Sequence, residues 1–205
     1  MGERLAERLH YLYFDTGVLY RAVAWLALRR GVKASDEAAL ALLAAEASID
    51  ISKPTVPDGR QYTVTVQGED VTWKLRGIDV ERIVSPVAAV AGVREALRQR
   101  QREIGLSGCV VLVGRDIGTV VLPEADLKIY LTASPQERAR RRHREILARG
   151  DQADFGQLLA SIRERDRIDS QRAVAPLRPA DDAIVIDTDH LTIEQELALI
   201  ERYLC

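Results

Sequence analysis

An arginine and an aspartate stand side by side directly after an apolar run of the sequence. Val110 to Val113 is an aliphatic run that predicts a buried parallel strand, and Gly114 ends it before Arg115 and Asp116. In open α/β sheets, ligands bind in the crevice beyond the carboxyl ends of the strands. A cation beside an anion at that edge suits a ligand that carries both phosphate and hydrogen-bond donors. The alternative is a surface ion pair that caps a turn and contributes little stability.

Two further blocks place hydroxyl groups near arginines. Thr16 and Arg21 stand at the start of a predicted helix, whose N-terminus carries free amides and the positive end of the helix dipole and so attracts anions. Ser85 and Arg94 frame a later helical region. Threonine and serine are also common N-cap residues, so each block has a plain structural interpretation beside the binding one.

A fourth block repeats the combination of arginine and carboxylate on one predicted helix. Arg165, Asp169 and Arg172 are separated by four and three residues, which brings their side chains to one helix face. The plain alternative is an ordinary ion pair between neighbouring turns. Each of the four blocks is a weak signal alone, but all four share the chemistry of a site for a phosphorylated ligand.

Alternating helices and strands must position these blocks. The pattern predicts a helix from Thr16 to about residue 30, closed by Gly31, and a helix over 135–148 that begins with a capping box of Ser134 and Glu137. Further helices are expected over residues 5–9, 36–47, from 85, and over 93–104, 155–167 and from 192, with strands over 11–14, 109–113, 127–131 and 183–187. Strands that alternate with helices imply a mostly parallel, helix-covered sheet.

A small antiparallel insert is expected between residues 49 and 80. A strand over 62–66, a turn at 68–70 and a partner strand over 71–75 would form a hairpin. Its inner side chains are expected to include Val64, Val66 and Trp73, as core rather than as a binding site. The remaining segments, 1–48 and 81–205, would then form the main domain.

Composition and charge exclude several classes of function. The 205 residues suffice for one domain with a full core, and the net charge of −2 excludes a globally basic nucleic-acid binder. Arginines nevertheless gather over 138–144 and 163–172, and their planar forks suit phosphate contacts. A nucleic-acid-binding interpretation rests on these two clusters alone, and solvated helix faces are the plain alternative.

Cysteines and histidines point to neither a disulfide framework nor a metal site. Cys109 and Cys205 have no metal-binding spacing, and Cys109, at the start of a strand, is expected to be buried. The three histidines are scattered along the sequence. No signal peptide and no long apolar span occurs, which predicts a cytoplasmic protein without a membrane partner.

Five segments together resemble the bacterial cytidylate kinase family, within the nucleoside-monophosphate kinase class. Residues 14–21 resemble its LDTGxxYR segment, 68–72 its GEDVT turn, 93–97 its VREAL segment, 114–121 its GRDIGTVV segment and 163–177 its ERDxxDxxRxxAPL segment. They follow in order through essentially all 205 residues. The resemblance implies a P-loop-kinase-like three-layer α/β fold, with 49–80 as the region that binds the nucleoside monophosphate (NMP) and an arginine-rich lid near 135–155.

The resemblance also assigns residues to the base of an acceptor nucleotide. Thr16, Ser85, Arg94 and Asp116 would read cytosine and seat the nucleotide. A carboxylate such as that of Asp116 can accept from the exocyclic amino group of cytosine, and an arginine can donate to the ring nitrogen and carbonyl. Uracil lacks that amino group, so this pairing would disfavour UMP.

Other residues are assigned by the resemblance to phosphate, sugar and transfer. Arg21 and Arg115 would hold the α-phosphate, Asp169 with Arg165 would reach the sugar, and Arg172 would complete the acceptor pocket. The activity implied is in-line transfer of the γ-phosphoryl group of ATP, with Mg²⁺, to CMP or dCMP by a monomer in pyrimidine nucleotide metabolism. The arginines expected to act in catalysis are Arg115, Arg138, Arg141, Arg142 and Arg172.

The sequence departs from the family pattern at two points. No G-x-x-x-x-G-K-[ST] motif, which cradles the β- and γ-phosphates, occurs in the 205 residues, and residues 1–9 resemble the helix that follows that loop. Val113 stands where the family often has an acidic residue. Without the loop and the first strand we expect little donor binding and a sheet with an exposed edge.

Three explanations of this departure are open at the level of sequence. The start of the protein is misassigned and the loop lies upstream; or the chain is a CMP-binding module or paralogue without catalysis; or a separate or fused segment supplies the loop. Turnover of ATP by the 205 residues would separate a kinase from an inactive binding module.

Overall fold

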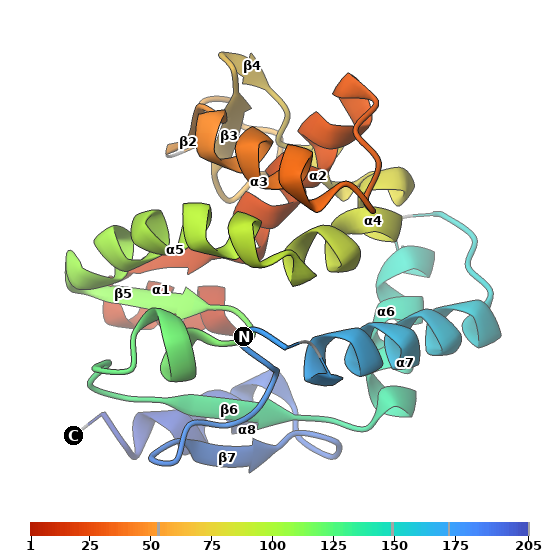
Figure 1. Ribbon diagram of the computed structural model, residues 1–205. Helices are drawn as coiled ribbons and strands as arrows, with labels where there is room; N and C mark the ends of the chain where they lie inside the picture. Colours follow the sequence, from red (N-terminus) through yellow and green to blue (C-terminus); the bar gives the residue numbers. More distant parts are fainter. Residues whose placement is uncertain (53, 149, 172, 205) are drawn as a thin grey trace. The chain divides into compact units, whose positions relative to one another are not determined.

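Helices and short strands alternate along the chain in the computed structural model, which describes residues 1–52, 54–148, 150–171 and 173–204 (Figure 1). The chain divides into unit 1, Met1–Tyr13 with Arg115–Cys205, and unit 2, Phe14–Gly114. The mixed α/β architecture and the small antiparallel sheet expected from the sequence are confirmed. No helix in the described part of the chain is long and apolar enough to cross a membrane.

Unit 2 contains four of the longer helices. They are α2 (Gly17–Arg30), α3 (Glu37–Glu46), α4 (Ile78–Ala89) and α5 (Ala91–Leu106). The inner face of α2 includes Leu19, Val23, Leu26 and Ala27, which are all buried. Gly31 ends α2 with a φ of 67°, a left-handed conformation that glycine adopts without steric cost.

Helices α3 and α5 approach each other closely at a glycine. A Cβ atom added to Gly92, in the first turn of α5, would lie within 3.0 Å of the Cβ atom of Ala41 in α3. Side chains that interdigitate this tightly leave no room for a methyl group, since protein interiors are packed as densely as organic crystals. Gly92 therefore sets the distance between the two helices.

Gly92→Ala is expected to lower the free energy of unfolding by about 1–3 kcal/mol, the usual cost of overpacking a core. Urea unfolding followed by circular dichroism measures the change. The double variant Gly92→Ala/Ala41→Gly removes the clashing methyl group, so it should recover most of the loss. Equal stability of Gly92→Ala and the unmodified chain would contradict the close approach.

The small sheet of unit 2 differs from the expectation in the position of its turn and of its last strand. It consists of β2 (Ile49–Ser52), β3 (Thr63–Val66) and β4 (Glu69–Asp70), all antiparallel. Gln67 and Gly68 form the two-residue turn with φ values of 54° and 80°, and such turns match the twist of a hairpin. The turn thus comes earlier than predicted, and the expected partner strand over 71–75 is wrong.

Residues after β4 instead form a short 3₁₀ helix, η1 (Lys74–Arg76). Val64 and Val66 are buried as predicted, but Trp73 is 44% exposed, so its assignment to the core is wrong. The Trp73 indole donates to Asp58 at 2.7 Å, and Arg60 also binds Asp58 and Asp70. These contacts lower the pKa of Asp58 and bring that of Asp70 to about 2.

Strand β5 (Val110–Val113) follows α5 and pairs with β1 (Leu12–Asp15) in a two-stranded sheet. The strand is where the sequence predicted it, but its side chains are half-buried to exposed rather than buried. β1 is its one hydrogen-bonded neighbour among the described strands, which leaves β5 less covered than a central strand. Cys109, expected to be buried, is exposed and has a φ of 50°.

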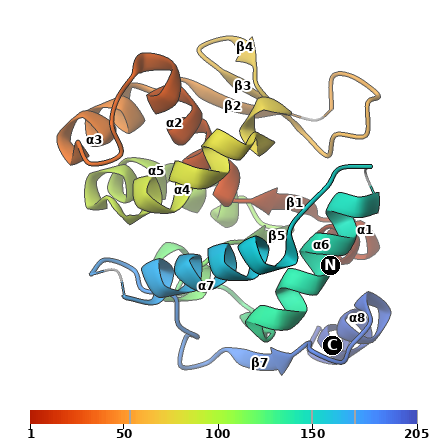
Figure 2. The same cartoon turned by 90° about the vertical axis from the view of Figure 1, so that its right-hand side faces the viewer.

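Unit 1 contains the remaining elements. They are α1 (Gly2–Leu9), a π-helical turn η2 (Ile117–Val121), β6 (Ile129–Thr132), α6 (Pro135–Ala148), α7 (Phe155–Gln171), β7 (Ile184–Asp187) and α8 (Ile193–Glu201). Strands β6 and β7 pair in parallel, and helices α6 and α7 lie side by side (Figure 2). Thr192 and Gln195 form a capping box at the start of α8, where the sequence predicted a helix.

Candidate functional site

The arginine that follows β5 binds a buried carboxylate on α7. Arg115 Nε donates to Asp169 Oδ2 at 3.1 Å, and Arg165 Nε lies 3.9 Å from the same oxygen. Asp169 is 4% exposed, whereas the side chains of Arg115 and Arg165 are 46% and 36% exposed. The structure therefore brings Arg115 together with Arg165 and Asp169, the two residues that the sequence predicted to share one helix face because they are four residues apart. Arg172, the third member of that block, lies outside the described residues.

Asp116 occupies a buried position directly after Arg115. It is 5% exposed, and its backbone oxygen accepts from Val120 N at 2.9 Å and Val121 N at 3.2 Å, which anchors the turn η2. The alternative of a surface pair between Arg115 and Asp116 is wrong, because Arg115 donates to Asp169 and Asp116 is buried.

The expected lid arginines on α6 have three different environments. Arg138 makes a two-pronged contact with Asp166 on α7, at 2.8 and 2.5 Å, and Asp166 raises the pKa of Arg138. Arg142 pairs with Glu145 three residues along the same helix at the surface. The sequence predicted the same role for these arginines, because helical spacing does not show which residues of other segments contact each of them.

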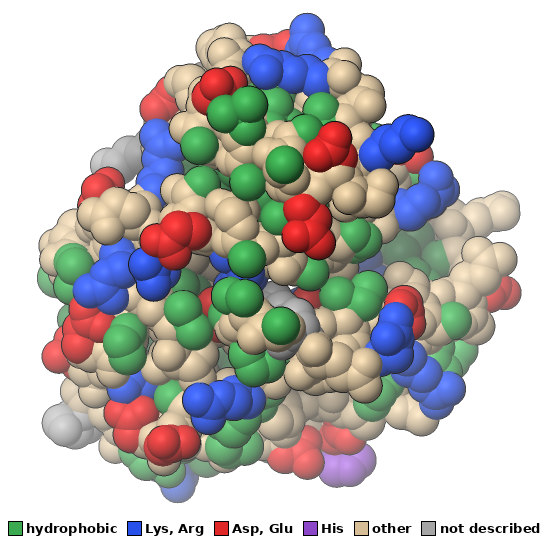
Figure 3. All heavy atoms as spheres, in the orientation of Figure 1, with side chains coloured by type: hydrophobic (Ala, Val, Ile, Leu, Met, Phe, Trp, Pro, Cys, Tyr) green, Lys and Arg blue, Asp and Glu red, His purple; other side chains and the backbone are tan. Residues whose placement is uncertain are grey.

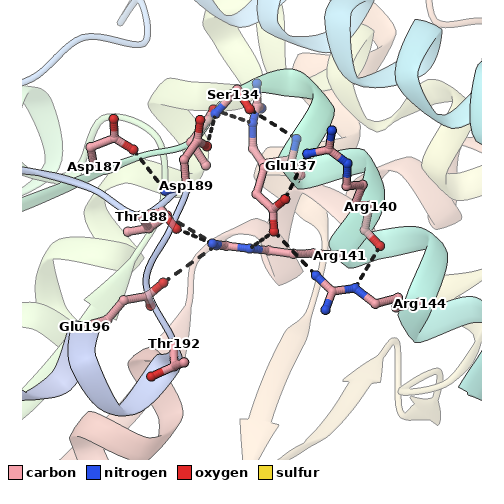
Figure 4. A network of polar contacts seen from close by, with 12 residues as sticks. Ser134, Glu137, Arg140, Arg141, Arg144, Asp187, Thr188, Asp189, Thr192 and Glu196 are labelled. Carbon is pink, nitrogen blue, oxygen red and sulfur yellow. Dashed lines mark hydrogen bonds and ion pairs between the residues drawn. The ribbon is translucent and has the colours of Figure 1, made fainter.

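Arg141 joins α6 to the end of β7 and to α8 (Figure 4). Its guanidinium donates to Glu137 Oε1 at 3.2 Å, to Thr188 Oγ1 at 3.2 Å and to the Thr188 carbonyl oxygen. Glu196, which is 4% exposed, lies 3.6 Å from the Arg141 Nη1 atom. A guanidinium with these partners orders three segments of unit 1 before any ligand is bound.

Burial raises the pKa of the Glu196 carboxyl above its ordinary value, while Arg141 acts in the opposite direction. A carboxyl with a raised pKa in the folded state binds its proton more tightly there than in the unfolded chain. The stability that it contributes is therefore complete below the ordinary glutamate pKa and is lost as pH rises through the raised value.

Glu196→Gln is expected to remove this loss of stability, so that its stability falls less than that of the unmodified chain between about pH 4 and about pH 7. Urea unfolding of both chains at several pH values across that window tests it. Glu194→Gln is the matched control on the same helix, because that exposed carboxyl has a lowered pKa and the opposite pH dependence. Parallel stability curves for Glu196→Gln and the unmodified chain would contradict the assignment.

The start of α6 differs from the predicted capping box. The Ser134 hydroxyl accepts from Glu137 N at 3.2 Å, which is one half of the box. The other half is absent, because Ser134 N donates to Asp189 Oδ1 at 2.6 Å (Figure 4). Glu137 instead binds Arg140, Arg141 and Arg144. The carboxylate of Asp189, from a distant segment, thus accepts the hydrogen bond that the Glu137 side chain would accept in a capping box.

In unit 2, Thr16 precedes α2 but does not cap it through its side chain. Its hydroxyl donates to the Val113 carbonyl oxygen at 3.0 Å, and its backbone nitrogen donates to the same oxygen at 2.9 Å. Thr16 has helical backbone angles and is 3% exposed. The N-cap interpretation is wrong in its chemistry, because the hydroxyl ties α2 to the end of β5 instead.

Arg21 and Arg94 contact neighbouring helices of unit 2. Arg21 Nη1 donates to Glu81 Oε1 at 2.9 Å and lies 3.4 Å from the Leu75 carbonyl oxygen. Arg94 is 6% exposed and donates to the Ala88 carbonyl oxygen at 3.0 Å, in the last turn of α4. Both side chains are therefore held in place by protein groups before a ligand binds.

Ser85 lies in the interior of α4, seven residues after the helix begins at Ile78. Its alternative interpretation as an N-cap residue is therefore wrong. Ser85 is half-buried, and its part in nucleotide binding stays a prediction.

Sequence reasoning missed several polar residues that hold the predicted site residues. Asp166 and Tyr20 lay within quoted motifs, so the sequence did carry a signal for them. Glu196 and Gln101 lay in none of these motifs. The described residues contain no group of three or more His, Cys, Asp or Glu side chains able to hold a metal ion.

Charges are mixed on the surface. On the face shown in Figure 3, Lys and Arg side chains are interspersed with Asp and Glu side chains. Many of the surface arginines pair with a carboxylate three or four residues away on the same helix, such as Arg98 with Glu95 and Arg167 with Glu164. The alternative interpretation of the arginine clusters as solvated helix faces is therefore correct for part of these arginines.

Comparison with known proteins gives a consistent result. The family model described as cytidylate kinase matches residues 1–204. A protein named cytidylate kinase from Chloroflexus aggregans is 54% identical over 200 residues, which cover 98% of this chain and 85% of that protein. One of the same name from Anoxybacillus flavithermus is 48% identical over 205 residues, 100% of this chain and 88% of that protein. A bifunctional pantoate ligase/cytidylate kinase from a Synechococcus strain is 46% identical over 207 residues, 38% of its own length.

Proposed function

Because the chain belongs to the cytidylate kinase family, we propose that it binds CMP or dCMP and transfers to it the γ-phosphoryl group of ATP, giving CDP or dCDP. The single observation that carries the acceptor half of this proposal is the cluster of Arg115, Arg165 and Asp169. Two partly exposed guanidiniums around a buried carboxylate offer donors for a phosphate and an acceptor for a sugar hydroxyl.

Recognition of the base is proposed for one carboxylate and one arginine. Asp116 would accept from the exocyclic amino group of cytosine, and Arg94 would donate to the ring nitrogen and carbonyl. Thr16 and Ser85 would seat the nucleotide. The burial of Asp116 and Arg94 supports this proposal, since a buried charge is costly and is retained where it has a specific partner.

Transfer is proposed to depend on arginines rather than on covalent chemistry. Two polyanions must approach each other, and at about 4 Å one opposite charge pair is worth about 4 kcal/mol at an effective dielectric of about 20. Arg21 and Arg115 would hold the acceptor phosphate, and Arg172 would complete the acceptor pocket. The lid residues Arg138, Arg141 and Arg142 would meet the donor phosphates, which requires Arg138 to exchange Asp166 for a phosphate oxygen.

A metal ion is proposed to enter with the donor. The described residues do not form a protein-held metal cluster, and Mg²⁺ is commonly bound through substrate phosphates with few carboxylates. Donor binding also needs the phosphate-cradling loop, whose G-x-x-x-x-G-K-[ST] motif the 205 residues do not contain.

The second candidate function is a CMP-binding module without turnover. Both candidates share the acceptor site and differ in donor binding. For the kinase we propose a cytoplasmic monomer with a core of 1–48 and 81–205, an NMP-binding region of 49–80 and a lid near 135–155. β2, β3, β4 and η1 lie within the proposed NMP-binding region.

Calorimetric titration of the 205-residue chain with CMP, and with UMP as control, tests the acceptor site. We expect binding of CMP with at least about a tenfold preference over UMP, since one well-placed base contact is worth about 1–3 kcal/mol. Circular dichroism of the same sample establishes that the protein is folded. Absence of CMP binding to the folded chain would overturn the proposed acceptor site.

A further inference from the structure

Two buried polar side chains lie on one face of α5. Arg94 and Gln101 are seven residues apart, which is close to two helical turns, and they are 6% and 1% exposed. Arg94 has a proposed role in reading the base. Gln101 has none, although a buried amide must be desolvated and gains little unless its hydrogen bonds are made.

Arg94 is held by groups from two other helices. The Ala88 carbonyl oxygen, near the C-terminus of α4, accepts from Arg94 Nη1 at 3.0 Å. The Arg94 guanidinium carbon also lies 5.3 Å from the centre of the Tyr20 ring, which belongs to α2. That distance is within the range of a cation–π contact, and such contacts are strongest where water is excluded.

Gln101 contacts the other end of the same aromatic side chain. Its Nε2 donates to the Tyr20 hydroxyl at 3.2 Å, and Tyr20 is 7% exposed. The hydroxyl can accept this bond because a phenol both donates and accepts. The Tyr20 ring is thus fixed at its hydroxyl by Gln101 and presents its face to Arg94.

We propose that Gln101 is a positioning residue for base recognition, which acts through Tyr20 to hold the Arg94 guanidinium in the orientation that cytosine requires. This inference rests on the proposed role of Arg94 in binding CMP. The gain is preorganisation: a guanidinium already ordered in the free protein loses less side-chain entropy when the nucleotide binds.

The alternative explanation is that Gln101 and Tyr20 only stabilise the core. The two explanations predict different results for the double variant Tyr20→Phe/Gln101→Met. Replacing both partners of a buried hydrogen bond with apolar groups of similar shape is nearly neutral for stability. A purely structural role would therefore leave CMP binding by the double variant unchanged.

The experiment measures calorimetric dissociation constants for CMP and UMP with the unmodified chain, Gln101→Met, Tyr20→Phe, the double variant and Arg94→Met. Gln99→Met is the matched control, because Gln99 is an exposed glutamine on the same helix. Thermal unfolding of each variant establishes the folded fraction.

We expect the double variant to bind CMP about three- to tenfold more weakly, the cost of one side chain that is no longer ordered in advance. The two single variants should show similar losses that do not add, since all three interrupt one chain of contacts. The preference for CMP over UMP should narrow in parallel, and Gln99→Met should bind like the unmodified chain.

Unchanged CMP affinity in the folded double variant, together with weakened binding in Arg94→Met, would overturn the positioning role and leave the proposed function standing. Unmodified affinity in Arg94→Met itself, or no preference for CMP in the unmodified chain, would instead overturn the proposed base recognition.

Discussion

Supplying a strand and a G-x-x-x-x-G-K-[ST] loop ahead of Met1 is expected to raise CMP-dependent ATP turnover by about 10³-fold or more over the 205-residue chain. In P-loop enzymes the loop amides and lysine bind the β- and γ-phosphates, and its hydroxyl residue binds Mg²⁺. Loss of a single preorganised donor to a developing charge costs about 10²–10³ in rate, and this loop supplies several. The 205 residues contain no such motif.

A coupled assay of ADP release, with CMP as acceptor, measures the effect. The matched control is the same extended chain with the loop lysine replaced by alanine, which keeps the added strand but removes the phosphate-binding cation. Turnover by the 205-residue chain at the rate of the extended chain would contradict the proposed need for the loop. An inactive extended chain that still binds CMP would favour the binding module.

Asp116→Asn is expected to weaken CMP binding by about 10- to 100-fold and to narrow the preference for CMP over UMP. A carboxylate only accepts hydrogen bonds, which suits the amino group of cytosine, whereas an amide also donates and so suits the carbonyl at the same position of uracil. One good base contact is worth about 1–3 kcal/mol of discrimination, and an energy of this size corresponds to a change in affinity of about 10- to 100-fold.

Calorimetry with both nucleotides measures the change, and thermal unfolding reports stability. Asp181→Asn is the matched control, because the Asp181 side chain is fully exposed and lies 3.8 Å from Arg178. The isosteric substitution keeps the buried shape at residue 116, so the loss of affinity should exceed the loss of stability. Equal losses of both would contradict the assignment of Asp116 to base recognition.

Local features were predictable from the sequence alone. Asp36 caps α3 by accepting from Ala39 N, and Thr192 and Gln195 form the capping box of α8, because these contacts join residues only three apart. The apolar run over 110–113 predicted the strand, and the spacing of Arg165 and Asp169 predicted their approach. The family was also recognisable, since its motifs are contiguous segments.

The partners of the polar site residues were not predictable in the same way. Thr16 donates to Val113, 97 residues away, instead of capping its own helix, and Arg115 donates to Asp169, 54 residues away, rather than contacting its neighbour. Gln101 reaches Tyr20 across 81 residues.

Sequence by itself therefore determined the helices, most of the strands and the family, because these depend on backbone preferences and on side-chain patterns within a few residues. Tertiary structure alone decided which buried polar groups form hydrogen bonds or ion pairs with one another. A buried donor or acceptor must find a partner wherever the fold brings one close, and the nearest such group in space is often distant in the chain.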